Sequence, residues 1–273
     1  LILAAGYATR LRPLTDTLPK QLLPVGGRPM VDWIVGKIRE AGIDEIHLVT
    51  NGRFAPLFDA WAETSHVTVH DDGTTTNETR LGAIGDIRFV RNETGWDDDL
   101  LVIAGDNLFD YSLADFARFA AGKNDASAVA VYDVGDRELA KHYGVIELDG
   151  DDRVVGFLEK PAEPPTTLCA TATYLYAREH ARLVDTYLDE GNPTDQPGHS
   201  IAWLHGPQPV YGFRIPCGCS DIGDAAQAQA ADHRLRGLAG LPLRASHFRD
   251  HSPPRGDHRR PPHGPPPDPT RSL

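Results

Sequence analysis

The stretch of sequence that decides the fold is LILAAGYATRLRP, residues 1–13, which passes from apolar residues into a loop of small ones. The run from Leu1 to Ala4 predicts a short β-strand, and Gly6 lies in the loop that follows it. Small residues let backbone N–H groups come close to phosphate oxygens. The first residues therefore predict a phosphate-binding loop at the carboxyl end of a strand.

The rest of the chain alternates strand and helix patterns. We expect strands at 46–50, 87–90 and 100–104, and helices at 30–38 (ending near 42), 54–62 and 112–121, the last opened by a possible N-cap Ser112. Later strands are expected at 126–134, 144–148, 154–159, 174–176 and 210–215, with helices at 178–188 and 224–238. This order predicts the α/β class: a doubly wound, mostly parallel, Rossmann-like mixed sheet with helices on both faces. The later strands are expected to extend the first sheet or to cover its open end.

The composition predicts one domain and a tail. Residues 1–250 are enough for one large α/β domain, whereas 251–273 are crowded with Pro, Arg and His. A segment of that kind buries too little apolar surface to fold, so we expect disorder there. A basic interaction tail and a reading-frame change at the end of the gene are the alternatives.

Charge and cysteine usage exclude several classes. A net charge of −12 argues against a general nucleic-acid binder. No apolar run is long enough for a membrane span, and the start lacks a signal peptide pattern. The three cysteines give no disulfide framework, so we expect a cytoplasmic protein. The start also lacks Met, so we expect the natural start a few residues upstream. Cys217 and Cys219 form a lone C-x-C that we interpret as ordinary thiols rather than a metal site.

Two cations follow the first strand. Arg10 can fork onto phosphate oxygens with two parallel hydrogen bonds, and Lys20 adds a compact second charge. Two cations and a row of amides suit a triphosphate. The chain contains neither the P-loop pattern nor the dinucleotide fingerprint, so this loop is of another kind.

A candidate metal ligand follows the apolar run at 100–104. Asp106 comes directly after this predicted buried strand, at the edge where α/β sheets bind ligands. Its carboxylate is a hard oxygen ligand of the type that Mg²⁺ prefers. Taken alone, an Asp in this position is also a common cap or turn former.

The first 25 residues resemble the signature of the sugar nucleotidyltransferases, the NDP-sugar pyrophosphorylases, which reads roughly L-A-G-G-x-G-T-R-L-x-P-x-T and then P-K-x-L-x-P. The matches are Leu3, Ala4, Gly6, Thr9, Arg10, Leu11, Pro13, Thr15, Pro19, Lys20, Leu22 and Pro24. The chain departs from the pattern at Ala5 and Ala8, where the family usually has Gly. The departure at Ala8 is the more serious one if the backbone there needs a positive φ.

The resemblance implies roles for particular residues. It implies that Arg10 and Lys20 grip the triphosphate and act in catalysis, with Asp106 and Asp221 as catalytic Mg²⁺ ligands. The nucleotide-binding residues it implies are Ala5, Gly6, Thr9, Arg10 and Lys20, with Glu78 and Gly82 as candidates facing the base. The sugar-phosphate residues it implies are Gly144, Glu159, Lys160, Ala170 and Tyr174. Around Asp221 the family's Trp is replaced by Cys219, and its Gly in the later sugar-side stretch is replaced by Ala172.

The implied reaction joins an NTP to a sugar 1-phosphate and gives an NDP-sugar and pyrophosphate, a step in polysaccharide biosynthesis. Glucose 1-phosphate with dTTP is the first candidate pair and UTP the second nucleotide, and the family also implies a homo-oligomer. One alternative is a catalytically inactive homologue that binds nucleotide or sugar phosphate and regulates a partner, motivated by Ala8, Cys219 and the unusual tail. A second is a glycosyltransferase with an Asp-held metal, which Arg10 and Lys20 argue against.

Overall fold

The computed structural model describes residues 1–124, 126–216, 220–221, 225–238 and 240–242, and for Arg10, Ser220, Asp221, Ala225 and Leu238 it describes the backbone alone. The predicted tail at 251–273 lies outside these residues, as do Cys217 and Cys219. None of the helices within the described ranges is long and apolar enough to cross a membrane.

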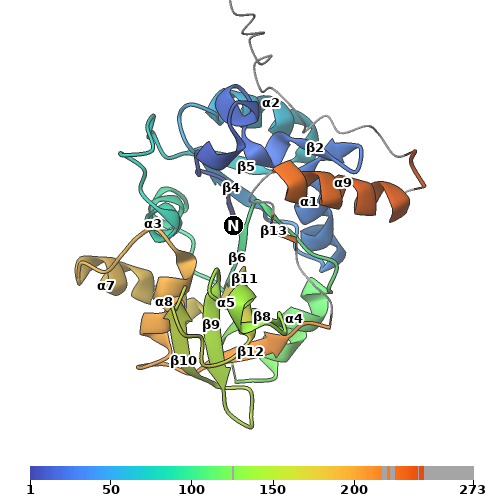
Figure 1. Ribbon diagram of the computed structural model, residues 1–273. Coiled ribbons are helices and arrows are strands. Elements are labelled where there is room, and N and C mark those ends of the chain that lie inside the picture. Colours follow the sequence, from blue (N-terminus) through green and yellow to red (C-terminus); the bar gives the residue numbers. More distant parts are fainter. Residues whose placement is uncertain (125, 217–219, 222–224, 239, 243–273) are drawn as a thin grey trace, which may run out of the picture.

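Within the described residues, nine strands form one mixed sheet in the order β10-β9-β11-β6-β1-β4-β5, with β8 pairing β11 and β12 (Figure 1). Their bounds are β1 Ile2–Leu3, β4 His47–Thr50, β5 Thr68–Asp71, β6 Leu100–Ala104, β8 Ser127–Asp133, β9 Gly144–Leu148, β10 Val154–Glu159, β11 Leu168–Tyr176 and β12 Val210–Arg214. The pairs of β1 with β4 and β6, of β4 with β5 and of β8 with β12 are parallel. The strand β11 joins this parallel core antiparallel to β6, and β9 and β10 continue from it. The later strands therefore extend the first sheet, as predicted.

The helices are α1 Met30–Glu40, α2 Ala55–Ser65, α3 Ala83–Thr94, α4 Leu113–Ala121, α5 Arg137–Ala140, α6 Arg178–Ala181, α7 Leu183–Asp189, α8 Pro197–Leu204 and α9 Ala225–Leu238. The predicted N-cap of α4 is confirmed, because the Ser112 side chain accepts a hydrogen bond from the Asp115 backbone N–H. The predicted end of the first helix near Gly42 is also confirmed.

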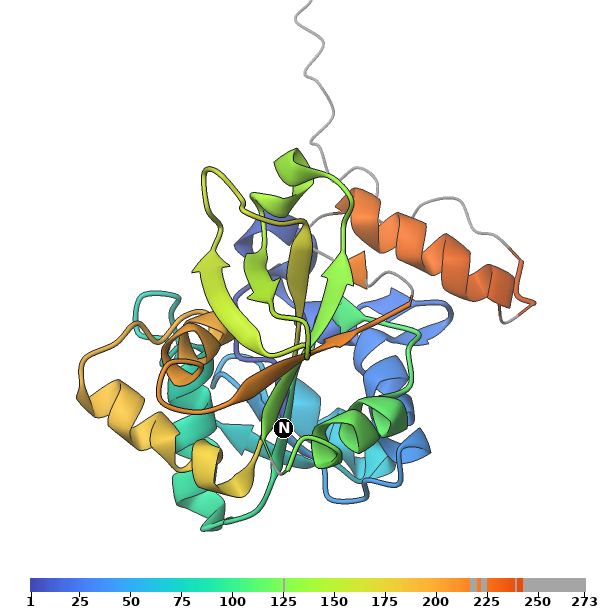
Figure 2. The ribbon, with the colours of Figure 1, turned by 90° about the horizontal axis from the view of Figure 1, so that it is seen from below.

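Successive residues of the central strands serve two hydrophobic cores on opposite faces of the sheet. Ile103 and Ala128 belong to the core covered by α1, α2 and α4, whereas their neighbours Val102 and Val129 belong to the core covered by α3, α6, α7 and α8. In Figure 2 the gold and teal helices of the second group lie to one side and the green and blue helices of the first to the other. This alternation confirms the predicted α/β fold with helices on both faces.

The predicted strand at 87–90 is wrong, because these residues lie inside helix α3. The buried residues Ile84, Ile87 and Val90 are three positions apart, which is the spacing of a helical face rather than of a strand. The segment 178–188 forms two short helices instead of one, and β5, α5 and α8 were not predicted. These three elements are short or flanked by polar residues, so their apolar pattern is weak.

The last described helix lies against the N-terminal half. Helix α9 packs into a cluster with Leu11, Leu23 and Val25, and the Asp232 carboxylate accepts hydrogen bonds from the Gly26 N–H at 2.8 Å and from Arg236. The short strand β13 (Ser220–Asp221) pairs antiparallel with β7 (Asn107–Leu108). The C-terminal part of the described chain is thereby held beside the residues that follow β6.

Candidate active site

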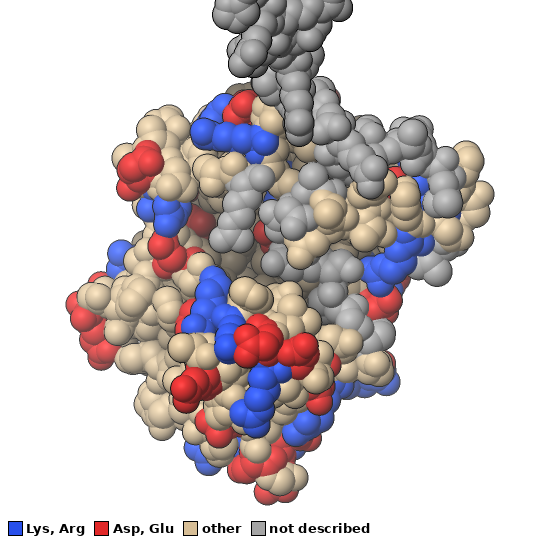
Figure 3. Space-filling model, viewed as in Figure 1, with Lys and Arg blue, Asp and Glu red and all other residues tan. Residues whose placement is uncertain are grey.

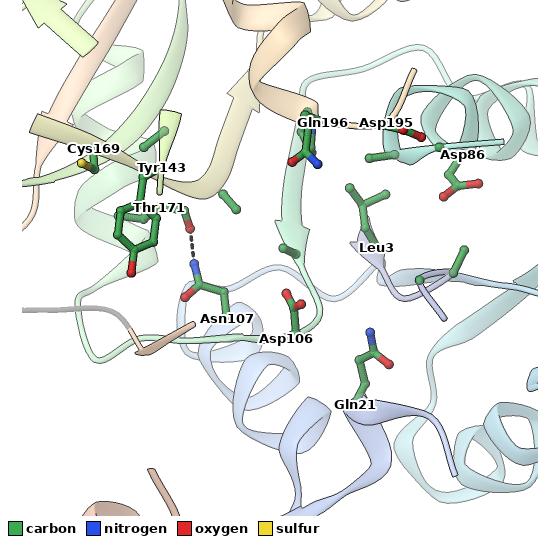
Figure 4. Close-up of a pocket in the computed structure, with 18 of the residues that line it drawn as sticks. Leu3, Gln21, Asp86, Asp106, Asn107, Tyr143, Cys169, Thr171, Asp195 and Gln196 are labelled. Carbon is green, nitrogen blue, oxygen red and sulfur yellow. Dashed lines mark hydrogen bonds between the residues drawn. The ribbon is translucent and has the colours of Figure 1, made fainter. Parts of the chain in front are cut away.

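A cavity of about 520 Å³ opens at the carboxyl ends of β1 and β6. Figure 3 shows this face of the molecule hollowed near its centre. The lining includes the predicted residues Ala5, Gly6, Gly82, Asp106 and Ala170, and also Leu3, Gln21, Arg80, Ala83, Asp86, Asn107, Tyr143, Cys169, Thr171, Ala172, Asp195 and Gln196. One cavity therefore unites residues from the first loop, helix α3 and strand β11 (Figure 4).

Protein contacts hold the loop after β1 in its shape. The Asn51 Nδ2 donates to the Ala5 carbonyl at 2.9 Å, and the Thr15 hydroxyl donates to the Ala8 carbonyl at 2.9 Å. Ala8 has φ 44° and ψ 43°, which is left-handed backbone. The suspected need for a positive φ at Ala8 is thus confirmed, and a residue with a Cβ is kept there at a cost of about 1–2 kcal/mol.

Lys20 forms an ion pair with Asp106, which lines the cavity. The Lys20 side chain is only 7% exposed, and its Nζ lies 2.8 Å from Asp106 Oδ2. A buried ammonium needs such a partner, because the cost of removing it from water is otherwise large. The Asp106 side chain is still 35% exposed, so its carboxylate remains accessible from the cavity.

The pairing of β7 and β13 brings the second predicted carboxylate residue near the first. Asp221 lies opposite Asn107 in the register, one residue from Asp106. Among the described residues there is no group of three or more His, Cys, Asp or Glu side chains that could hold a metal. The two predicted residues, Asp106 and Asp221, still fit Mg²⁺, because this ion is commonly held by one or two carboxylates and takes its other ligands from substrate phosphates and water.

The sugar-side residues gather where β9 meets β10. A Cβ built on Gly144 would lie 2.7 Å from the Phe157 ring and 3.0 Å from Glu159 Oε2, so the close packing at this point requires a glycine. The Glu159 side chain is 16% exposed, and the Lys160 Nζ lies 3.5 Å from its Oε1. Ala170 lines the cavity, whereas Gly144, Glu159 and Lys160 are not among its lining residues.

Three further predicted residues do not line the cavity. Glu78 is exposed in the loop before α3, and Thr9 is exposed at the start of a 3₁₀ turn, Thr9–Leu11. Tyr174 is buried in the core beneath α3 and α8, and burial raises the pKa of its hydroxyl well above the usual value. The structure describes no side chain for Arg10 or Asp221.

Gln21 and Asp86 are two buried polar residues among those of the cavity that the sequence analysis missed. Gln21 follows Lys20 directly and is 4% exposed, and its Oε1 is buried without a hydrogen bond to any described residue. Asp86 is also 4% exposed, in the first turn of α3. The position beside Lys20 could have indicated Gln21, but Asp86 lies in the segment predicted to be a strand.

Asp86 shares its surroundings with a second carboxyl group. Burial, the nearby charge of Asp72 and a hydrogen bond between the two side chains raise the pKa of Asp86 to about 8. Burial also raises the pKa of Asp72, while hydrogen bonds from Thr74 oppose the rise. The pair therefore holds a proton at neutral pH.

The fold is that of an α/β protein whose cavity lies at the carboxyl ends of parallel strands, where sheets of this kind bind ligands. The sequence model of the family described as nucleotidyl transferase matches residues 1–204. The chain belongs to this family.

Relatives with known names agree with this assignment. A glucose-1-phosphate thymidylyltransferase of Streptomyces antibioticus is 32% identical over 178 residues, covering 64% of this chain and 48% of that protein. A mannose-1-phosphate guanylyltransferase of Mycobacterium tuberculosis is also 32% identical over 178 residues, covering 65% and 48%. The chain spans about half the length of these curated relatives. A UDP-glucose pyrophosphorylase structure from Acinetobacter baumannii superimposes with a TM-score of 0.72 at 22% identity over 89% of this chain and 94% of that one, which confirms the fold.

Proposed function

We propose that this chain transfers a nucleotidyl group from an NTP to a sugar 1-phosphate, giving an NDP-sugar and pyrophosphate. The observation that carries the proposal is that one cavity is lined by Ala5 and Gly6 of the first loop, by Asp106, which Lys20 pairs with from behind the lining, and by Ala170. The names of the relatives, which transfer thymidylyl and guanylyl groups to sugar phosphates, support the same reaction.

In the proposed reaction a phosphate oxygen of the sugar phosphate attacks the α-phosphorus in line, and pyrophosphate leaves. No covalent enzyme intermediate is required, so the residues act by positioning and by stabilising charge. Arg10 and Lys20 would neutralise the charge that develops on the leaving pyrophosphate, while backbone amides around Gly6 and Thr9 hold its oxygens. Two phosphate charges 4 Å apart repel by about 4 kcal/mol at an effective dielectric of 20, so cations here favour their approach.

Asp106 and Asp221 are the proposed Mg²⁺ ligands. When bound, Mg²⁺ would supply positive charge to the α-phosphate and the sugar phosphate. The contact of Lys20 with Asp106 Oδ2 holds the carboxylate in place on the protein side. Asp106→Asn should therefore abolish metal-dependent turnover, and an unchanged Mg²⁺ titration of activity in this variant would contradict the assignment.

On the other wall, Glu159 would accept hydrogen bonds from sugar hydroxyls and Lys160 would bind the sugar phosphate. Gly144 permits close approach here, because any side chain would strike Phe157 and Glu159. Ala170 forms the adjoining surface of the cavity. Tyr174 supports this wall from the core.

The substrate pair is part of the proposal: glucose 1-phosphate with dTTP first, and UTP as the second nucleotide. The relatives differ in both base and sugar, so a panel of NTPs and sugar 1-phosphates decides it. We expect pyrophosphate release with one pair at a rate well above the others, dependent on Mg²⁺. Tight nucleotide binding with no pyrophosphate release from any pair would instead support a regulatory homologue.

We further propose that residues 1–250 form the catalytic domain and that the protein is a cytoplasmic homo-oligomer. Light scattering of the purified chain measures its mass in solution, and a monomer at working concentrations would contradict the oligomer.

A further inference from the structure

Asp86 is a buried acid in the wall of the cavity, on the first turn of α3. Its side chain lines the cavity, and among the described residues no N–H or O–H group reaches its Oδ1, which is buried. The Oδ2 of Asp72 is likewise buried without a described donor. The two side chains are hydrogen-bonded to each other, so one proton shared between these two oxygens satisfies both of them.

The rest of the pair is fixed by the chain. Asp72 Oδ1 accepts hydrogen bonds from the Thr74 N–H and the Thr74 hydroxyl, both at 2.7 Å. The proton between the carboxyl groups occupies their facing oxygens. What Asp86 presents to the cavity is then an acceptor, not a donor.

The cavity has two sides, with Asp106 between them. Figure 4 shows Asp86 and Leu3 on one side and Tyr143, Cys169 and Thr171 on the other. In the proposed reaction the reacting phosphates lie at Asp106 and the sugar lies beside Tyr143. The nucleoside must then occupy the side lined by Leu3 and Asp86, where the small residues Gly82 and Ala83 leave room for a flat ring.

We propose that Asp86, held by Asp72, accepts a hydrogen bond from the ring N–H of the nucleobase and so selects guanine, uracil or thymine over adenine and cytosine. The first three bases carry a ring N–H donor on their pairing edge. Adenine and cytosine carry an unprotonated ring nitrogen at the corresponding position, which places an acceptor against an acceptor. This inference rests on the proposed function, because it concerns the nucleotide of that reaction.

The test is equilibrium binding of GTP, UTP, dTTP, ATP and CTP to the full chain with Mg²⁺ and without sugar phosphate. The wild-type protein should bind at least one of the first three more tightly than ATP and CTP. Asp86→Leu keeps the approximate shape of the side chain but removes the acceptor. The ratio of the affinity for the preferred nucleotide to the affinity for ATP or CTP should therefore fall by about tenfold, the value of one buried hydrogen bond. Asp86→Asn should retain the ratio, because its amide donates to Asp72 and its carbonyl still faces the cavity.

Asp195→Leu is the matched control. Asp195 lines the same side of the cavity, but its carboxylate is bound to Arg80 at 2.8 Å, so the selectivity ratio should not change. Equal affinities for all five nucleotides in the wild-type protein, or an unchanged ratio in Asp86→Leu, would overturn the inference and leave the proposed function intact. No binding of any NTP to the wild-type protein would overturn both.

Discussion

Replacing Asp86 by Asn should stabilise the protein, and the gain should grow with pH. In the folded protein, burial and Asp72 raise the pKa of Asp86 to about 8. In the unfolded chain the same carboxyl titrates near its ordinary value of about 3.9. Between these two values the folded state holds a proton that the unfolded state has lost.

The sign and the size follow from proton linkage. Between about pH 4 and 8 the folded state binds more protons than the unfolded state, so the free energy of unfolding decreases as pH rises through this range. The stabilising contribution of protonated Asp86 is therefore fully present below about pH 4 and is lost towards pH 8. The slope is about −1.4 kcal/mol per pH unit, so the loss is on the order of 3 kcal/mol at pH 6 and 5 kcal/mol at pH 8. An Asn amide supplies a permanent N–H to Asp72, so the variant avoids this loss.

Urea unfolding at pH 5, 6, 7 and 8 measures the effect as the difference in unfolding free energy between Asp86→Asn and wild type. The difference should rise steadily with pH. Glu78→Gln removes one charge from the exposed loop just before α3, and it controls for general charge effects. A difference that stays constant across this range, or a variant that is less stable at pH 8, would show that Asp86 does not hold the extra proton.

Three further changes test other parts of the site. Lys20→Ala should lower kcat by orders of magnitude while circular dichroism shows an intact fold; near-normal pyrophosphate release would contradict its role. Ala8→Gly should relieve left-handed strain of about 1–2 kcal/mol but add flexibility to the unfolded chain worth about 0.4–1 kcal/mol, for a small net rise in Tm. A clear fall in Tm would show that the methyl group makes stabilising contacts. Gly144→Ala should raise KM for the sugar phosphate and cost about 1–3 kcal/mol of stability, because the new Cβ meets Phe157 and Glu159; unchanged kinetics and unchanged urea unfolding would show that this wall adjusts.

The sequence predicted the elements whose pattern is purely local. The run at 100–104 is apolar throughout, as a strand buried on both faces must be, and Ser112 caps the next helix with its own side chain. The segment 87–90 was wrongly predicted as a strand, because a short apolar run inside a helix looks like a buried strand. The glycines that cap this helix, Gly82 and Gly95, lie five residues outside the run.

Residues of the cavity could be predicted only where they are close in sequence. The loop after the first strand shows its pattern within a few positions, so the sequence indicated Gly6, which lines the cavity, and Lys20, which pairs with Asp106. Asp86 could not be found, because its role depends on Asp72 from the end of β5 and on the packing of α3 beside β1. No spacing within either segment indicates that they meet.

Three backbone carbonyls around the cavity accept hydrogen bonds from side chains, and these contacts orient the peptide groups that follow them. Asn51 binds the Ala5 carbonyl, Thr15 binds the Ala8 carbonyl, and the Asn107 amide binds the Thr171 carbonyl. In a planar trans peptide the C=O and the following N–H point in opposite directions. Each of these contacts therefore turns the next N–H, that of Gly6, Thr9 or Ala172, away from the anchoring side chain. Ala8 and Ala172 both have left-handed backbone, with φ of 44° and 52°, so the chain accepts strain where these peptide groups are oriented. In the proposed reaction these amides would need little rearrangement to hold phosphate oxygens, because the orienting contacts come from the protein, and preorganisation of this kind would lower the barrier.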